Sequence, residues 1–353
     1  MKPSRTFLGA VALALLAACD IPTDVPTVDS RWILEAESTT IGVGDLLPSG
    51  VRISGSQFAV DVDPFSTMRS LGDMCATCAS LNLQMAPKPS FASSFTVDAS
   101  FSADVSGADL ASASVEIAIT NNFEFDPIRP PGGSTGSLTL TLTDAASGRQ
   151  LGQTVVDGAV TAFGANQTLT RTMTLAPGQV GSSFVMTVEL VSPAGGSAPT
   201  DLVPINTSDD FRVNATPSAV LVNSADVDVS NRNVTLDPVA LDVGDMDAAI
   251  INRIQGGAIV LDIQNPFGVG VDAQLQITVG GQPVVTKAFS VSGQASSSTS
   301  VSLTGDDFRA FLGHNGVALT GTGSVSAAAG TITVRPDQQV LVDGKIDLTL
   351  QIG

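Results

Sequence analysis

Cys75 and Cys78 are separated by two residues in the stretch MCATCAS, and a pair at this spacing can hold a metal, act as a redox couple or close a local disulfide. A structural zinc site needs two further ligands, and His314 is the single histidine of the chain. A c-type haem needs histidine at position 79, where the chain has Ala79. A thioredoxin-like site needs a βαβ unit, which the surrounding sequence does not predict. The compartment of the protein therefore decides how the pair is used.

The stretch Gly132–Gly136 (GGSTG) satisfies the letters of the G-x-S-x-G motif of serine hydrolases. That motif requires a strand before the serine and a helix after it. Here PIRPP precedes Ser134 and the strand-like SLTLTLT follows it, so we interpret the stretch as a loop. His314, which a triad would need, lies in the turn sequence GHNG. We therefore predict no serine triad.

Three acidic clusters are candidate calcium ligands, because calcium prefers oxygen donors. The first is Asp242, Asp245 and Asp247 in DVGDMD, and the others are Asp226 with Asp228 and Asp61 with Asp63. None has the central glycine and terminal glutamate of a calcium loop. Alternating aspartates also mark the solvated face of a strand. We interpret them as surface charge and predict no metal and no cofactor.

The first twenty residues, MKPSRTFLGAVALALLAACD, have the layout of an export signal. Leu16-Ala17-Ala18-Cys19 resembles the lipobox of bacterial lipoproteins. The resemblance implies cleavage before Cys19, a lipid thioether on its sulfur and a membrane anchor of more than one acyl chain. In enterobacterial lipoproteins an aspartate after the cysteine favours the inner membrane, and Asp20 fits that pattern. Inner and outer membrane both remain open.

Export from the cytoplasm would favour a disulfide over a metal site or a redox couple for the cysteine pair. With Cys19 assigned to the lipid, Cys75 and Cys78 are left as a pair outside the cytoplasm, where such pairs are oxidised. We predict a local disulfide.

The composition excludes some ligands. The chain has 34 acidic and 16 basic residues and a net charge of −18, which disfavours nucleic acid and anionic membrane as direct ligands. It has no tyrosine and a single tryptophan, Trp32, which argues against a sugar cleft built on aromatic stacking. A hydrophobic content of 43% is ample for a core.

Strand patterns dominate the chain. SLTLTLTD (137–144) and VEIAIT (115–120) alternate apolar and polar residues, and LTRTMTLA (169–176) does so with Arg171 as the exception on the apolar face. The best helical pattern is TGDDFRAFLG, where Thr304 and Asp307 predict a capping box. This spacing of short strands and turns predicts β-sandwiches.

The chain also predicts an internal duplication. VEIAITNNFEF (115–125) aligns with IVLDIQNPFGV (259–269), which matches Asn121 with Asn265 and Phe123 with Phe267. Two strands joined by a glycine-containing turn follow each copy, and then a further strand. The first copy carries two insertions, the CATC region and the loop DPIRPPGGSTG.

The stretch VLDIQNPFGVGVDAQLQITVGGQPV in the second copy resembles the late-embryogenesis-abundant, water-stress-and-hypersensitivity family over about 25 residues. The resemblance implies an immunoglobulin-like sandwich without catalysis. From the residues themselves, Asn265 is expected to bond its own backbone and turn the chain, while Pro266 prevents further strand pairing.

We therefore predict an all-β protein of two tandem immunoglobulin-like sandwiches, with a signal peptide (1–18), a tether (19–44), a first sandwich with the CATC insertion (45–200), a linker (201–216) and a second sandwich (217–353). We expect a lipid-anchored cell-envelope protein that acts as a non-catalytic binding or scaffolding module. Its partners would be the membrane, through Cys19, and an envelope protein. The alternative is an extracytoplasmic hydrolase whose converging carboxylates the sequence does not identify.

Overall fold

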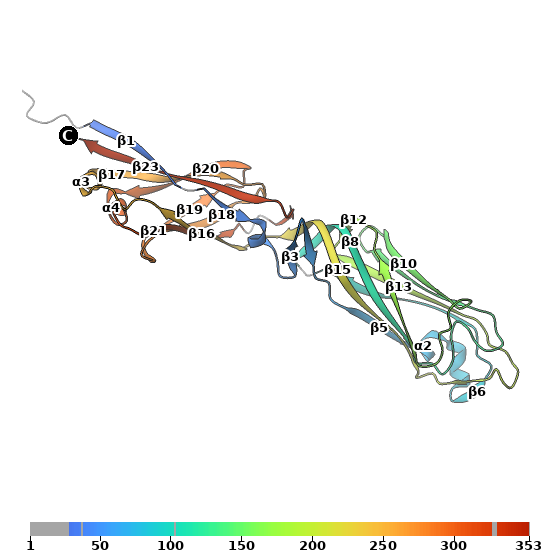
Figure 1. The fold of residues 1–353 in the computed structure, drawn as a ribbon. Helices are drawn as coiled ribbons and strands as arrows, with labels where there is room; N and C mark the ends of the chain where they lie inside the picture. The colour runs from blue at the N-terminus through green and yellow to red at the C-terminus, as the bar shows by residue number, and fades with distance from the viewer. Residues whose placement is uncertain (1–27, 37, 102–103, 327–329, 353) are drawn as a thin grey trace, which may run out of the picture.

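The computed structural model describes residues 28–36, 38–101, 104–326 and 330–352, and most of these residues lie in β-strands. The strands build two β-sandwiches that lie end to end in an elongated molecule (Figure 1). The predicted all-β sandwich fold is confirmed.

The host sandwich contains both ends of the described chain. One of its sheets has the order β1-β23-β17-β20, with β2 also paired to β23: β1 (Val28–Glu35), β23 (Gln339–Ile352), β17 (Ile254–Gln264), β20 (Ser296–Thr304) and β2 (Thr39–Gly42). The facing sheet has the order β16-β21-β18-β19: β16 (Asn233–Leu241), β21 (Val317–Val325), β18 (Val271–Val279) and β19 (Gln282–Val291). Two short helices accompany it, α3 (Ala248–Ile251) and α4 (Gly305–Arg309). Thr304 and Asp307 form the predicted capping box of α4.

The inserted sandwich is built from the middle of the chain, residues 51–228, and the short strand β22 from the later part of the chain joins it. One sheet has the order β10-β9-β13-β7: β10 (Gln150–Asp157), β9 (Ser137–Asp144), β13 (Ser183–Ser192) and β7 (Phe91–Ser100). The other has the order β11-β8-β15-β4-β3, with β5, β12 and β22 on its edges: β11 (Gln167–Thr174), β8 (Val105–Asn121), β15 (Asp210–Asp228), β4 (Gln57–Val60), β3 (Val51–Ser54), β5 (Phe65–Ser70), β12 (Gly178–Gly181) and β22 (Thr331–Val334). The remaining elements are η1 (Val43–Leu46), α2 (Leu71–Met74), η2 (Ala76–Leu81), β6 (Gln84–Ala86) and β14 (Val203–Ile205).

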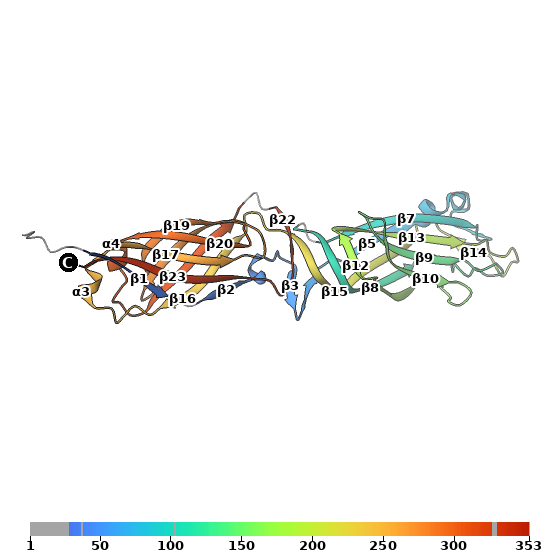
Figure 2. The same ribbon diagram turned by 90° about the horizontal axis from the view of Figure 1, so that it is seen from above.

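The inserted sandwich interrupts the host sandwich between β2 and β16. Strand β1 pairs antiparallel with β23, with Val28 opposite Ile352, so the first and last described strands lie side by side. The chain then crosses to the inserted sandwich, returns through β15 and completes the host sandwich (Figure 2). The sandwiches are nested along the chain, whereas the sequence predicted them in tandem.

Two predicted boundaries differ from the structure. Residues 19–44 were expected as a tether, yet their described part forms β1, β2 and η1. Residues 201–216 were expected as a linker, yet they contain β14 and the start of β15. Pro217 lies within β15, just before a register irregularity between Ser218 and Leu221, which is a position where a strand tolerates proline. The turn-forming residues around Pro217 hid the strand pattern of β15 in the sequence.

The two sandwiches have the same strand order. Starting from the edge strand β11, one sheet of the inserted sandwich has the order β11-β8-β15-β5. The corresponding sheet of the host sandwich has the order β20-β17-β23-β1. The facing sheets run β10-β9-β13-β7 and β19-β18-β21-β16. This correspondence pairs β8 with β17, as the sequence alignment requires. Common ancestry of the two sandwiches stays a prediction.

Asn121 and Asn265 make the same turn at the ends of β8 and β17. Asn265 Oδ1 accepts from Phe267 N at 3.1 Å, and its Nδ2 donates to Val269 O at 2.8 Å. Asn121 repeats both bonds with Phe123 N and Phe125 O, at 3.0 and 2.9 Å. The predicted role of Asn265 in turning the chain is confirmed.

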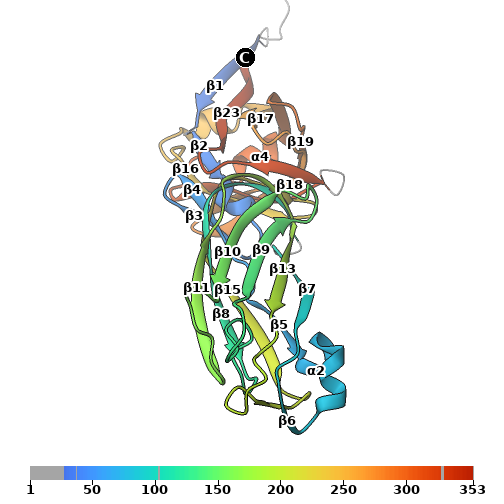
Figure 3. The same ribbon diagram turned by 90° about the vertical axis from the view of Figure 1, so that its right-hand side faces the viewer.

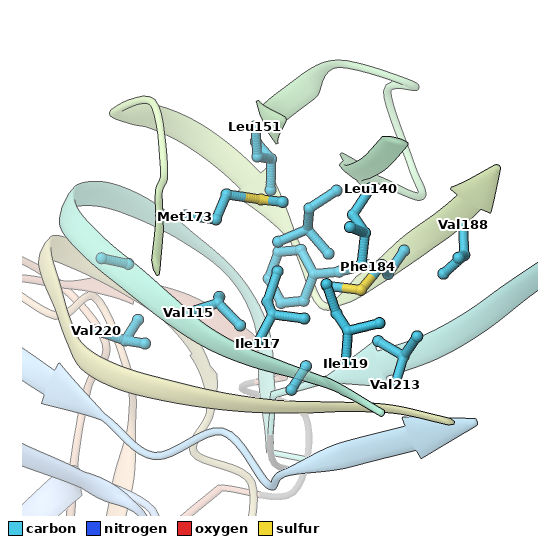
Figure 4. Close-up of a cluster of buried hydrophobic side chains, with 14 of the residues drawn as sticks. Val115, Ile117, Ile119, Leu140, Leu151, Met173, Phe184, Val188, Val213 and Val220 are labelled. Carbon is cyan, nitrogen blue, oxygen red and sulfur yellow. The ribbon is translucent and has the colours of Figure 1, made fainter. Parts of the chain in front are cut away.

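The cores follow the predicted alternation. Leu138, Leu140 and Leu142 of β9 are at most 3% exposed and belong to the same apolar cluster as Ile117 and Ile119 of β8. Figure 4 shows Leu140, Ile117 and Ile119 in this core. Its apolar cluster continues into the host sandwich and takes in three host residues: Phe267, Val269 and Val325. The junction between the sandwiches is therefore packed with apolar side chains.

Candidate functional site

Cys19 and the leader lie outside the described residues. Cys75 and Cys78 are joined by a disulfide and are at most 1% exposed, as the predicted staple requires. They close the corner between α2 and η2. Ser70 caps α2, and its hydrogen bonds to Asp73 lower the pKa of that carboxyl.

Ser134 and His314 lie in different sandwiches. Ser134 is exposed in a loop that leads into β9, with no helix after it. His314 is exposed in a turn between α4 and β21, flanked by Gly313 and Gly316, both with positive φ. The structure does not bring the two together, in agreement with the sequence analysis.

The acidic candidates do not gather. Asp247 caps α3 by accepting from Ala249 N at 2.7 Å, and Asp242 and Asp245 are solvent-exposed. Asp61 pairs with Arg52 at 2.5 Å, and Asp226 accepts from the Thr333 hydroxyl at 2.5 Å. Among the described residues no group of three or more His, Cys, Asp or Glu side chains could hold a metal ion.

The distinctive surface is a set of loops at the end of the inserted sandwich remote from β1 and β23 (Figures 2 and 3). We call it the distal loop cluster and define it as residues 71–90, 122–136, 158–166 and 193–209. It contains both insertions that the sequence analysis singled out. Backbone hydrogen bonds tie its loops to one another: Gly195 N to Lys88 O (2.9 Å), Gly196 N to Pro131 O (2.7 Å), Leu83 N to Ile205 O (2.6 Å) and Gly72 N to Thr207 O (3.0 Å).

Glycines let these loops approach one another closely. A Cβ on Gly133 would lie 2.2 Å from Ala194 O, and one on Gly136 would lie 2.0 Å from Val191 O. Asp126 adds a polar link, since its carboxylate accepts from Ile128 N, Arg129 N and Phe163 N at 2.6 to 2.9 Å. The GGSTG segment is thus part of a closely packed loop. The cluster is a preformed surface.

Lys88 is buried inside this cluster, 1% exposed, and the sequence analysis missed it. Its Nζ donates to the carbonyls of Pro89 (3.1 Å) and Pro193, and it lies 5.1 and 5.6 Å from the ring centres of Phe91 and Phe125. Burial lowers the pKa of Lys88 to about 8, and the carboxylate of Asp126 opposes the shift. The proline on each side, in PKP, was the only signal in the sequence.

Lys88 gives the inserted sandwich a predictable pH dependence. Its pKa of about 8 lies below its usual value of 10.5, so the unfolded chain binds more protons between those pH values. The free energy of unfolding should therefore rise by up to about 3 kcal/mol as the pH increases from 8 to 10.5. Urea unfolding across this range should show the rise in the wild type. The variant Lys88→Met, which keeps the stem but has no titrating amine, should not show it, and parallel curves would refute the assignment.

No family model matches this chain, and no curated protein matches it. Among solved structures, a protein of Parabacteroides distasonis described as secreted is 12% identical, with coverage of 90% of this chain and 99% of its own and a TM-score of 0.31. The VP2 subviral particle of infectious bursal disease virus is 11% identical, with coverage of 93% and 74% and a TM-score of 0.21. At these scores the likeness carries no functional argument. Within the described residues, no helix is long and apolar enough to cross a membrane.

Proposed function

We propose that this chain is an exported, lipid-anchored protein of the cell envelope that acts as a non-catalytic binding or scaffolding module. One observation carries the proposal. Strand β1, which follows the lipobox-like leader, lies at one end of the elongated molecule, and the distal loop cluster lies at the other (Figure 2). A lipid on Cys19 would therefore hold the host sandwich near the membrane and present the cluster away from it.

The side chains at the tip of the cluster support a binding role. Leu83 is 80% exposed and has φ +60°, a backbone conformation that costs a leucine roughly 1–2 kcal/mol relative to ordinary regions. Met85, two residues further in β6, is 61% exposed. Exposed apolar side chains on a rigid backbone are suited to bury against a protein partner at little entropic cost. Strain that the fold keeps at an exposed position is a pointer to function.

Site-specific photo-crosslinking in envelope preparations tests the binding role. A photoreactive residue at Met85 should capture one discrete envelope protein. The same residue at Val284, which is 40% exposed on β19 of the host sandwich, is the matched control and should not capture it. Equal capture at both positions, or no product at Met85, would contradict a binding role for the distal loop cluster.

The variant Leu83→Gly separates binding from folding. Glycine relieves the backbone strain but has more freedom to lose on folding, so the free energy of unfolding should change by no more than about 1 kcal/mol. Capture from the Met85 position should nevertheless fall, because the partner loses an apolar contact. Unfolding in urea and the crosslinking yield measure the two effects. A large loss of stability with unchanged capture would show that Leu83 serves only the fold.

The anchor is tested at Cys19. The variant Cys19→Ser should lack the lipid, because the thioether requires a sulfur, and it should stay unprocessed or become soluble. Detergent partitioning and the intact mass of the purified protein measure this. Identical partitioning and mass for wild type and variant would show that the lipobox reading is wrong.

A second candidate function, an extracytoplasmic hydrolase, has one observation in its favour. Burial, and then the negative charges of Glu124 and Asp210, raise the pKa of Asp209, whose Oδ2 is buried without a hydrogen-bond partner. Hydrogen bonds from Arg212 lower the pKa of Asp210 next to it. Neighbouring carboxyl groups with divergent pKa values are typical of acid–base pairs. Hydrolysis of glycoside or peptide substrates that Asp209→Asn abolishes would favour this candidate over the binding module.

A further inference from the structure

An apolar cavity of about 100 Å³ lies between the two sheets of the host sandwich, at the end that meets the inserted sandwich. Leu261 and Ile263 of β17 line it from one sheet, and Val271 of β18 and Val325 of β21 line it from the other. Ile41 of β2 and Leu46 of η1 close it from the connection between the sandwiches. Phe289 and Val291 of edge strand β19 are half-buried parts of the lining, so solvent reaches the cavity beside them.

The inserted sandwich fills the corresponding space with aromatic rings. Beside Asn121, the rings of Phe123, Phe125, Phe163 and Phe211 pack in tilted and edge-to-face pairs with centres 5.4 to 6.2 Å apart. Beside Asn265, Phe267 matches Phe123, but Val269 stands where the inserted sandwich has Phe125.

A second phenylalanine of the inserted sandwich is also replaced by a smaller side chain in the neighbouring host strand. Phe211 of β15 pairs with Asn121, whereas the host strand β23 has Val340 next to Leu341, the partner of Gln264. Small side chains in the facing sheet, Ala273 and Gly323, also line the cavity. Interiors of proteins are packed to high density, so a void of this size is unusual in a sandwich whose counterpart is filled. Because the inserted sandwich has the same strand order and a filled core, the void in the host sandwich results from its small side chains and not from its topology.

The buried amide of Asn265, which lines the cavity, has its hydrogen bonds to the backbone of the turn. Asn265 bonds to Phe267 N and Val269 O, and its own N–H donates to Ala295 O at 2.9 Å. It is 4% exposed, and its amide oxygen and nitrogen each have a protein partner. A dry apolar cavity of about 150 Å³ takes up benzene or xenon. A cavity of about two thirds of that volume suits xenon or the end of an aliphatic chain.

We propose that this cavity is a binding site for the end of an aliphatic chain, such as the acyl tail of an envelope lipid or a short alcohol. The tail enters past Phe289 and Val291 and displaces no ordered polar contact. Because Ile41 and Leu46 also line the cavity, the bound chain packs against the connection between the two sandwiches. This site is independent of the distal loop cluster.

Cavity-filling variants copied from the inserted sandwich test the proposal. Val340→Phe places the ring of Phe211, and Val269→Phe that of Phe125, so each should fill the void without breaking the fold. The matched control is Val284→Phe, the same change on the outer surface of β19. All variants are made in the full chain carrying Cys19→Ser, which removes attached acyl chains as competitors.

Two measurements decide the outcome. Xenon-pressurised crystals of the parent chain should show xenon between the sheets beside Asn265. Hexanol should bind the parent and Val284→Phe equally by calorimetry, and Val340→Phe should bind it about tenfold more weakly, as if burial of roughly two methylene groups were lost. Val269→Phe replaces Val340→Phe if the latter does not fold. No xenon in the cavity, or equal hexanol affinity for the filled variants, would overturn the proposal, and crosslinking from Met85 would be unaffected in either case.

Discussion

A chain in which residues 28–42 are joined through a short Gly-Ser linker to residues 231–352 should fold by itself, whereas residues 217–353 alone should not. The first chain contains every strand of the host sandwich, and β2 and β16 lie in contact, so a short linker can replace the inserted sandwich. The second chain lacks β1 and β2, so the long strand β23 loses the partners of one edge. Circular dichroism and cooperative urea unfolding distinguish the two results.

The control for this experiment is the same joined chain without β1, beginning at Thr39. It should be less stable than the full host sandwich, because the edge of β23 from Lys345 to Ile352 is left uncovered. If residues 217–353 unfolded cooperatively on their own, the predicted tandem arrangement would describe the folding units better than the nested one.

The variant Asn121→Ala should lower the free energy of unfolding of the inserted sandwich by about 3–5 kcal/mol. The side chain is completely buried and donates to the carbonyls of Phe125, Phe163 and Gly164 at 2.9 to 3.0 Å while accepting from Phe123 N. Alanine leaves two or three of these backbone groups buried without a partner, at about 1–3 kcal/mol each. Urea unfolding, followed by circular dichroism, measures the loss.

Asn265→Ala is the matched control in the host sandwich. Asn265 makes two of the same bonds, to Phe267 N and Val269 O, so its loss should cost less, about 2 kcal/mol. Equal effects at both positions, or a loss below about 1 kcal/mol at Asn121, would show that the turn is held mainly by its phenylalanine side chains.

Local patterns in the sequence predicted those parts of the fold that local forces determine. Alternation placed Leu138, Leu140 and Leu142 on the buried face of β9, and the pair Thr304 and Asp307 located the start of α4. The nesting of the sandwiches could not be read in this way. It depends on β1 pairing with β23 across almost the whole chain, and an edge strand with Trp32 and Ile33 partly exposed has no strong apolar pattern.

The candidate sites likewise differ in whether local sequence or distant contacts determine them. The disulfide of Cys75 and Cys78 followed from the compartment and a spacing of two residues. The distal loop cluster and the cavity depend on segments far apart in the chain: Lys88 donates to Pro193, and Ile41 and Val325 line the same cavity. The burial of Lys88 and the cavity beside Val269 can be recognised only in the folded structure, because both depend on segments that are distant in the sequence.

The pairing of β1 with β23 also determines how the molecule would resist a pull. If the N-terminus is tethered and a partner pulls on the distal loop cluster, tension acts along β1, parallel to the strand axis. Hydrogen bonds of an antiparallel ladder run perpendicular to the strands, so this geometry loads the pairs from Val28 to Glu35 together in shear. Peeling would break them one at a time at lower force. The pairing of β1 along the edge of the sheet would thus give a tethered protein a mechanically resistant attachment.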